Sequence, residues 1–409
     1  MDICIIGAGV TGLTAGYELL KMGHRVTIME KENHYGGLAA SVPLGSTGID
    51  RFYRHIFTSD LDIIRMIAEL GLSKDLCWNT PRNAIFAGGK LYPFTSSLDL
   101  LLFKELSTVD RVRTGLLVLR ARSINDWRKL ENTSAKEWLI KTAGDASYKV
   151  IWDPLLRSKF GCDAELVSAV WLWNKFKLRG SSRGKNCDKE VLGYLKGSFG
   201  VLCDRIVKAI EASDGILKLS SEVTEISTAE NGHIAVKCQD EKLKYQKVIF
   251  TAAPDILANI CTSFTDAYKK NLVSLKYKAN ICAMIKMSKP LTRYYWTTVT
   301  AADSPYVLAV EHTNMVSDEH YASNVLYLSR YIDEADELYG MSDDLITEIF
   351  LNYLKKMFPS FSTDNVQEVI ISRAVHAQPV VGTGYSEKLP GIRTPVDNLY
   401  LASMAQIYP

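Results

Sequence analysis

The first thirty residues alternate short apolar runs with a helical pattern. The run Asp2–Ile6 is almost wholly apolar, as a strand buried on both faces of a parallel sheet should be. A glycine-rich stretch follows, and apolar residues then recur at helical spacing until Gly23 ends the helix. A second apolar run, residues 25–29, ends on Glu30. The pattern predicts a strand–helix–strand unit, and therefore an α/β fold around a parallel sheet.

The glycine-rich stretch has the spacing of a dinucleotide-binding turn. Gly7 permits the tight turn, Gly9 lets a pyrophosphate approach the backbone, and Gly12 lets the helix lie close to the strand. Unpaired N–H groups at the helix start would face the phosphates. Glu30 can accept hydrogen bonds from the ribose, and its charge disfavours the 2′-phosphate of NADP. The alternative is a turn of purely structural use. The sequence favours a dinucleotide site that comprises Gly7, Ala8, Gly9, Val10, Thr11, Gly12 and Glu30.

Periodicity along the rest of the chain predicts elements of both kinds. Amphipathic helices are expected at residues 60–70, 200–210 and 343–358. Strands are expected at residues 85–87, 90–92, 216–219, 222–226 and 247–250. The first two of these strands form a hairpin closed by Gly88-Gly89. Alternation between residues 272 and 371 predicts a mixed or antiparallel sheet beside the parallel one.

Helical spacing and basic residues dominate between residues 98 and 189. Leucines interleave with arginines there, a mixture that suits a helix facing anionic lipid or a pocket for an anionic or prenyl substrate. The simpler hypothesis, a core helix with a solvated basic face, is favoured. Residues 152–161 are predicted to be loop-like, and Arg157 with Lys159 is a candidate anionic-substrate site among aromatic residues. Surface packing would explain the pair nearly as well. The polar stretch 181–189 is the expected domain boundary.

Composition narrows the class of protein. The chain has 409 residues, 47% of them hydrophobic, which is enough for two cores. A net charge of +2 gives no reason to expect nucleic-acid binding. The eight cysteines are scattered and predict reduced thiols in a cytoplasmic protein, and no His/Cys cluster predicts a metal site. No apolar run reaches the length of a membrane span, and the apolar start is needed as a core strand, so no signal peptide is expected.

Three pieces of the N-terminal sequence resemble the flavin-dependent amine oxidase superfamily. These pieces are the glycine turn at 7–12, Glu30-Lys31, and the stretch 36–41 that begins with a second glycine pair. The superfamily includes protoporphyrinogen oxidases, phytoene-type desaturases and UDP-galactopyranose mutases. The resemblance implies a Rossmann-like domain that binds FAD, interleaved with an α+β substrate domain. It implies an FAD-binding domain of residues 1–95, 191–255 and 375–409 and a substrate domain of residues 96–190 and 256–374.

The resemblance also assigns residues to the flavin. It adds these cofactor contacts to the turn: Lys31, Gly36, Gly37, Leu38, Ala39, Arg54, His55, Ile56, Val223, Ala252, Ser403 and Met404. Arg54 and His55 are expected beside the flavin ring as catalytic candidates, together with Arg157 and Lys159 on the substrate. Taken alone, His55 is more often a satisfied, partly buried histidine.

Three functions follow as hypotheses. The leading one is an FAD-dependent oxidoreductase of the amine oxidase and desaturase type, acting on a small organic, isoprenoid or glycan-precursor substrate. The match at 55–57 supports a second, a flavin-dependent sugar mutase resembling UDP-galactopyranose mutase. The third is a non-catalytic nucleotide-binding subunit. Leu38 where the family usually has Arg, Ser403-Met404 where it has Gly-Asp, and the absence of the closing helix before Pro409 favour this third hypothesis. Peripheral membrane contact is compatible with the leucine- and arginine-rich stretch, and the sequence leaves the oligomeric state open.

Overall fold

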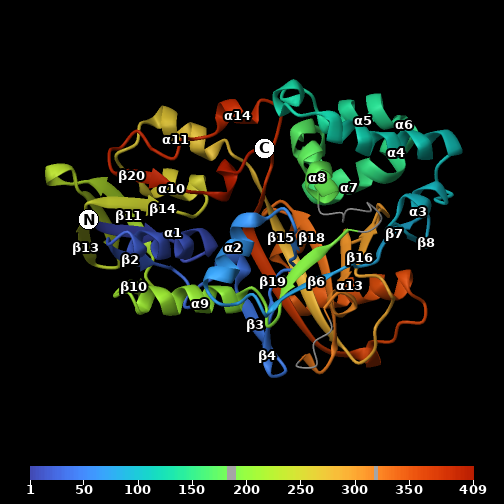
Figure 1. Ribbon diagram of the computed structural model, residues 1–409, viewed down its shortest axis with the longest axis horizontal. Coiled ribbons are helices and arrows are strands. Elements are labelled where there is room, and N and C mark those ends of the chain that lie inside the picture. Colours follow the sequence, from blue (N-terminus) through green and yellow to red (C-terminus); the bar gives the residue numbers. More distant parts are fainter. Residues whose placement is uncertain (182–189, 317–320) are drawn as a thin grey trace.

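The structure is a computed structural model that describes residues 1–181, 190–316 and 321–409 (Figure 1). A parallel sheet lies at one end of the molecule, a seven-stranded sheet lies beside it, and a group of helices covers the other end. The parallel sheet has the strand order β10-β2-β1-β14-β20. Its strands are β1 (Asp2–Ile6), β2 (Arg25–Met29), β10 (Ile216–Lys218), β14 (Lys247–Phe250) and β20 (Leu399–Leu401). The predicted α/β fold and the predicted strands at 2–6, 25–29 and 247–250 are confirmed.

The two faces of the parallel sheet are covered by different elements. Alternate side chains of a strand point to opposite faces, so Ile5 enters one core cluster while Cys4 and Ile6 enter another. Helices α1 (Val10–Lys21) and α9 (Gly200–Glu211) pack on the Ile5 face. The other face is covered by an antiparallel meander and a helix, which are β11 (Val223–Thr228), β12 (Ile234–Cys238), β13 (Glu241–Tyr245) and α10 (Pro254–Ile260). Both faces are therefore apolar, as the unbroken apolar runs predicted.

The seven-stranded sheet has the order β19-β15-β18-β17-β16-β7-β8. Its strands are β7 (Asn83–Ala87), β8 (Lys90–Pro93), β15 (Tyr277–Met287), β16 (Trp296–Val299), β17 (Leu308–Glu311), β18 (Asn324–Ile332) and β19 (Val366–Pro379). Helix α13 (Asp343–Met357) packs on one face of this sheet. On the other face, Cys282 and Met284 share a core with Ile5 and Ile28 of the parallel sheet. The predicted mixed sheet is confirmed, because β7 and β16 are parallel and the other neighbours are antiparallel.

The predicted hairpin is confirmed, but it belongs to the seven-stranded sheet. Gly88 and Gly89 both have positive φ, 55° and 73°, as a two-residue hairpin turn with both central residues left-handed requires. The hairpin pairs with β16, so residues 83–93 join the sheet that otherwise comes from residues 277–379. The expected domain limits stay a prediction. The stretch 182–189, where one boundary was expected, lies outside the described residues.

Helices fill the segment between the hairpin and residue 181. They are α3 (Ser97–Leu101), α4 (Thr108–Ser123), α5 (Ala135–Ala143), α6 (Asp145–Ser147), α7 (Asp153–Phe160) and α8 (Ala169–Ser181). The prediction of a loop-like stretch at 152–161 is wrong. A π-helical turn, Tyr148–Trp152, runs directly into α7, where Pro154 lies in the first turn and needs no N–H partner. Arg157 adds an ion pair to Asp153 one turn before it, which the aromatic composition concealed.

Smaller elements connect these layers. They are β3 (Ser41–Leu44), β4 (Thr47–Asp50), β5 (Ile56–Phe57), α2 (Leu61–Glu69), β6 (Leu76–Asn79), β9 (Leu192–Leu195), α11 (Asp266–Val273), α12 (Glu337–Gly340) and α14 (Tyr385–Lys388). Within the described ranges, none of the helices has both the length and the apolarity needed to cross a bilayer.

Candidate functional site

The carboxyl ends of four parallel strands bring the predicted cofactor residues to one edge of the sheet. Glu30 follows β2, the turn that begins at Gly7 follows β1, Ala252 follows β14, and Ser403 follows β20. The backbone N–H of Gly7 donates to the carbonyl of Met29 at 2.8 Å, which holds the first two of these ends together. Ligands of open parallel sheets bind at this edge. The fold thus assembles the predicted site from segments as far apart in the sequence as Gly7 and Ser403.

The glycines of the first turn are needed for two different reasons. A Cβ on Gly12 would lie 1.9 Å from the carbonyl oxygen of Gly7, so a side chain there would collide with the preceding turn. Gly7 itself has a φ of +105°, and its added Cβ would meet Thr251. A Cβ on Gly9 would meet nothing within 4 Å. Gly9 is therefore the open point of the turn, where another molecule can approach the backbone.

The start of α1 is left uncapped by side chains. Gly9 is the N-cap residue and offers no side-chain acceptor, and the first turn contains no acidic residue. Val10 and Thr11 are exposed in that first turn, whereas Ala8 is fully buried behind it. The unpaired N–H groups of a helix start are donors for an anion. An anionic group beside Gly9 would accept hydrogen bonds from these N–H groups.

The carboxylate of Glu30 is fixed by the turn it faces. One oxygen accepts the backbone N–H of Ala8 at 2.7 Å, and the other accepts that of Glu32 at 3.0 Å. Each carboxylate oxygen has a second acceptor position, so Glu30 can still bind two hydroxyl groups. The neighbouring Lys31 is 62% exposed and pairs with Glu32 at 3.6 Å. Of the two predicted residues, Glu30 points into the edge of the sheet and Lys31 lies on the surface.

The second glycine pair lies against the first turn. Gly36 donates its backbone N–H to the carbonyl of Ala8 at 2.8 Å, and a Cβ on Gly37 would lie 3.2 Å from Cα of Gly9. Both glycines have positive φ, 99° and 54°. Leu38 follows with its carbonyl turned to Arg54, and Ala39 is buried. The second glycine pair therefore packs directly on the first glycine turn.

Arg54 is held beside this second turn with an unused donor. Its Nη2 donates to the carbonyl of Leu38, while its buried Nε has no hydrogen-bond partner among the described residues. Asp50, at the end of β4, is buried near it. Burial raises the pKa of Asp50 to about 6, against the opposing charge of Arg54. Asp50 accepts hydrogen bonds from the Tyr194 hydroxyl at 2.7 Å and from a backbone N–H at 3.1 Å.

Asp50 was not among the predicted site residues. The sequence offers one indication of its role, because Asp50 is an acidic residue at the end of a short strand. It directly follows Ile49, which is fully buried. Its partner Tyr194 lies 144 residues away along the chain, so no local pattern could pair the two residues.

His55 lies in an aromatic cluster. Its Nδ1 is 3.2 Å from the hydroxyl of Tyr295, and its ring packs edge-on against Phe57 and Trp296 with centroids 5.2 and 5.8 Å apart. Ile56, the next residue, is buried in β5, which pairs with β9. His55 is therefore partly buried and hydrogen-bonded, which agrees with both the flavin role and the simpler structural one.

The two predicted substrate residues lie in different surroundings. Arg157 is half exposed and is engaged on its own segment, with Asp153 at 3.0 Å and Glu165 at 3.5 Å. Lys159 lies instead over the ring of Tyr331 on β18, 4.5 Å from its centroid. Tyr331 neighbours Tyr53, whose pKa is raised well above its usual value by burial and then by this contact. The structure thus places Lys159, but not Arg157, one aromatic residue away from the 53–55 stretch.

The later cofactor candidates close the edge from the other side. The backbone N–H of Ser221, two residues before Val223, donates to the carbonyl of Glu30 at 2.7 Å. Val223 is buried, and the added Cβ of Gly7 would lie 3.8 Å from the backbone nitrogen of Ala252. These contacts place Ala252 beside the first turn and Val223 close to Glu30.

Ser403 and Met404 begin a capped 3₁₀ turn after the last strand. The hydroxyl of Ser403 lies 3.3 Å from that of Tyr277 on β15, and the side chain of Met404 is 39% exposed. Close by, Asp255 accepts a hydrogen bond from His376 at 2.9 Å, a pair that sequence reasoning missed because its members are 121 residues apart. The pair ties α10 to β19 and so closes the seam between the two sheets.

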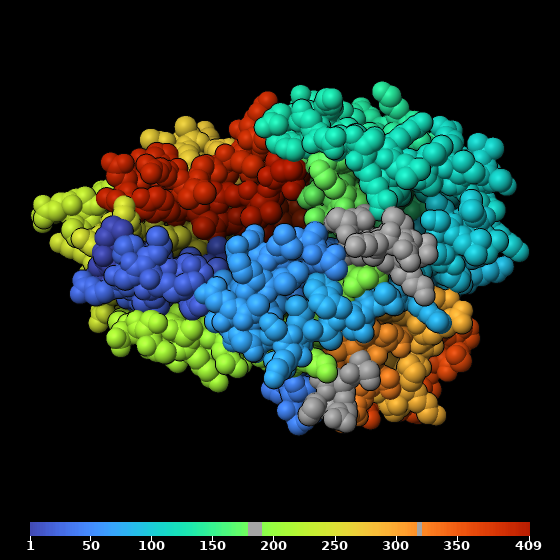
Figure 2. Space-filling model, viewed as in Figure 1, coloured from blue at the N-terminus to red at the C-terminus, as the bar shows by residue number. Residues whose placement is uncertain are grey.

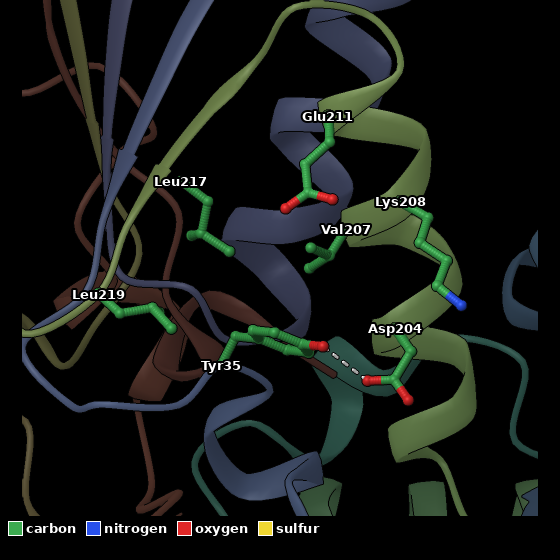
Figure 3. Close-up of a pocket in the computed structure, with 7 residues that line it drawn as sticks. All are labelled: Tyr35, Asp204, Val207, Lys208, Glu211, Leu217 and Leu219. Carbon is green, nitrogen blue, oxygen red and sulfur yellow. Dashed lines mark hydrogen bonds between the residues drawn. The ribbon is translucent and has the colours of Figure 1, made fainter.

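A cavity of about 360 Å³ lies beside Tyr35, between α9 and β10 (Figure 3). Its lining combines the carboxylates of Asp204 and Glu211 with apolar side chains, and Lys208 also borders it but points its ammonium group away from Tyr35 and Glu211 (Figure 3). Tyr35 donates its hydroxyl to Asp204 at 2.8 Å and closes one side. The carboxylates make this cavity unsuited to a pyrophosphate, so it is not the predicted dinucleotide site. The hydrogen bond to Asp204 at the wall of this cavity holds Tyr35, and with it the loop that leads to Gly36.

The fold brings two glycine turns to the edge at which parallel α/β sheets bind ligands, and comparison with known proteins shows the class of protein. The family model of flavin containing amine oxidoreductases matches residues 10–409. The chain belongs to this family of flavin-containing oxidoreductases. The zeta-carotene desaturase of Capsicum annuum is 24% identical over 311 residues, covering 70% of this chain and 52% of the desaturase. The chain thus spans about half the length of this relative.

Solved structures show the same fold at low sequence identity. A protein of Exiguobacterium sp. 255-15 assigned as a protoporphyrinogen oxidase matches with a TM-score of 0.78 and 19% identity, over 98% of this chain and 93% of that protein. A reduced UDP-galactopyranose mutase matches with a TM-score of 0.72 and 16% identity, over 95% and 86%. The predicted superfamily and fold class are confirmed.

Proposed function

We propose that this chain binds FAD and catalyses the two-electron oxidation of a small organic substrate of isoprenoid or glycan-precursor type. The observation that carries the proposal is the meeting of Glu30, Gly9, Gly36 and Ala252 at one sheet edge. The family membership supports a flavin, and the two adjoining glycine turns support a dinucleotide rather than a mononucleotide. Neither the contacts of the described residues nor the comparisons favour the mutase or the non-catalytic alternative over oxidation.

The residues at this edge fit FAD. The uncapped start of α1 would take the pyrophosphate beside Gly9, and Glu30 retains two acceptor positions for the ribose hydroxyls. The buried Nε of Arg54 meets no acceptor in the described part of the chain, and a bound flavin can supply one beside Leu38. When bound, FAD supplies the acceptor for the hydride that leaves the substrate.

The protein's own contribution is to bind and orient. The aromatic rings around His55 offer apolar walls that exclude water from the region beside Arg54. Lys159, over Tyr331, brings a positive charge to the same region and would attract an anionic group of the substrate. The proposal includes the predicted cytoplasmic location, which the scattered cysteines support.

Purified protein should carry a flavin that is released on denaturation and identified by mass as FAD. Replacing Glu30 with Ala should weaken FAD binding about tenfold to hundredfold, because two hydrogen bonds to a charged acceptor are lost. Glu30→Gln keeps one acceptor and should give an intermediate affinity.

Glu32→Ala is the matched control for this test. Glu32 is an exposed acid two residues away whose side chain pairs only with Lys31 among the contacts described. Its replacement should leave FAD affinity unchanged. Colourless protein that does not take up added FAD, or equal losses in the Glu30 and Glu32 variants, would overturn the proposal.

A further inference from the structure

Helix α4 presents apolar side chains on two opposite faces. Thr114, Leu117 and Ala121 are buried against the neighbouring helices α5 and α8. The opposite face carries a second stripe at positions separated by three, four and three residues, with exposed fractions of 42% to 67%, namely Val109, Val112, Leu116 and Leu119. This spacing places them in one line along the helix. A helix that is apolar on both sides is normally covered on both.

Helix α3 extends the exposed stripe into a surface. It packs on α4 through Leu100, close to Gly115, and leaves three leucines exposed, namely Leu98, Leu101 and Leu102. Seven of the nineteen exposed large hydrophobic side chains in the described residues therefore fall between positions 98 and 119. Single exposed leucines are ordinary, whereas such a concentration marks a surface that binds something. These seven residues are called the leucine surface below.

The leucine surface is bordered by positive charge. Residues 97–123 contain five basic and three acidic side chains, and the basic Lys104, Arg113 and Arg120 are exposed. The three acids already have partners nearby. Asp99 accepts two backbone N–H groups from the residues just before α3, Asp110 accepts from Ser107, and Glu105 accepts from Tyr92 of the hairpin. Apolar side chains ringed by cations match a bilayer with anionic headgroups.

We propose that the leucine surface docks the protein on an anionic lipid bilayer. The exposed leucines and valines would enter the boundary between headgroups and acyl chains, while Lys104, Arg113 and Arg120 contact the headgroup phosphates. A second copy of this chain suits the surface less well, because a symmetric contact would set the same positive charges against one another. The positive charge beside the leucine surface therefore favours an anionic lipid bilayer over a second copy of the chain.

The position of the leucine surface agrees with this role. Helices α3 and α4 form the end of the molecule opposite the parallel sheet (Figures 1 and 2). Beneath them, an apolar cluster that contains Phe103, Leu106 and Ile151 packs on Ile85 of β7. The strand β7 pairs with β16, where Trp296 contacts His55. Apolar side chains therefore extend from the leucine surface to the candidate substrate region, so docking would bring that region close to the lipid.

Co-sedimentation with lipid vesicles tests the proposal. The full chain should bind vesicles of equal parts phosphatidylglycerol and phosphatidylcholine, and raised salt should weaken the binding because exposed charges are screened. The triple variant Val112→Ser, Leu116→Ser, Leu119→Ser should bind these vesicles at least about tenfold more weakly. Its flavin content and melting temperature should stay at the wild-type values, because the three side chains are exposed and α4 lies at the opposite end of the molecule from β2, the strand that Glu30 follows (Figure 1).

Leu345→Ser is the matched control. Leu345 is an equally exposed leucine on α13, 42% exposed, outside the leucine surface. Its replacement should leave vesicle binding unchanged. Three results would overturn the proposal: no binding of the wild-type chain to the anionic vesicles, equal losses in the triple variant and the control, or a wild-type dimer that the triple variant abolishes without any change in vesicle binding.

Discussion

The carboxyl edge of the parallel sheet and the helical segment 97–181 solve different physical problems. The edge is made mainly of backbone groups, and Gly9, Gly36 and Glu30 are held there by hydrogen bonds between neighbouring turns. The helical segment is held by side chains, through the cluster around Leu117 and Leu139 and through one buried cation, Lys278. Small steric changes should therefore destroy the edge, while the helical segment should respond to changes in charge and apolar area.

Gly12→Val should have the largest effect. The added Cβ would lie 1.9 Å from the carbonyl oxygen of Gly7, and backbone cannot yield there without opening the turn. We expect a loss of at least about 4 kcal/mol in the free energy of unfolding, or no folded protein, with FAD binding lost in either case. Denaturant unfolding and FAD titration measure both effects. Gly340→Ala, where an added Cβ meets nothing within 4 Å, should change neither, and a stable Gly12→Val protein with normal FAD affinity would contradict the account.

Lys278→Met tests how the helical segment is attached to the seven-stranded sheet. The Lys278 side chain is fully buried, and its Nζ lies 2.7 Å from Asp163, in the turn after α7, and 2.5 Å from Asp333. Removing the cation leaves Asp163 with little solvent, so we expect a loss of about 3 kcal/mol in the free energy of unfolding. Lys276→Met is the control, since Lys276 also contacts Asp163 but is 62% exposed, and it should cost less than about 1 kcal/mol. Similar losses in the two variants would contradict a role for the buried cation.

Asp50→Asn tests, through pH, the buried acid beside Arg54 at the carboxyl edge. The folded-state pKa of Asp50, about 6, lies above its ordinary value of 3.8, because burial disfavours the charged form. The folded state therefore holds the proton more tightly, and Asp50 makes stability fall as pH rises from about 4 to about 6. A separation of roughly two pKa units corresponds to about 3 kcal/mol at most.

The Asp50→Asn variant should lack this decline. The free energy of unfolding of the variant minus that of wild type should rise by roughly 2 kcal/mol from pH 4 to pH 7. The reason is that Asn stays neutral over this range and can still accept the backbone N–H of Phe199. Unfolding measured at several pH values checks this. Parallel pH profiles for the two proteins would show that Asp50 does not titrate in this range.

The two regions also differ in what their sequences revealed. At the carboxyl edge, Gly7, Gly12 and Glu30 are required by local backbone geometry, so residues close together in sequence predict the turn. In the helical segment, composition suggested a loop at 152–161, whereas a proline in the first turn and an ion pair one turn apart give a helix. Neighbouring residues therefore predicted the glycine turn correctly, whereas the composition of residues 152–161 predicted the wrong secondary structure.

Long-range partners were beyond the reach of sequence reasoning altogether. The bonds of Asp50 to Tyr194 and of Asp255 to His376 join residues more than 100 positions apart. The expected core face and exposed basic residues of α4 are both present, but a line of valines and leucines that was not expected shares the solvent side with the arginines. The mixture of residue types was visible in the sequence, but the face each residue occupies depends on how α5 and α8 pack.

The most direct test of the account is a crystal structure of the protein with FAD. The account predicts ribose oxygens within hydrogen-bonding distance of Glu30 and a pyrophosphate at the start of α1, beside Gly9. A nucleotide bound instead in the cavity lined by Tyr35, Asp204 and Glu211, with the glycine edge left empty, would contradict it.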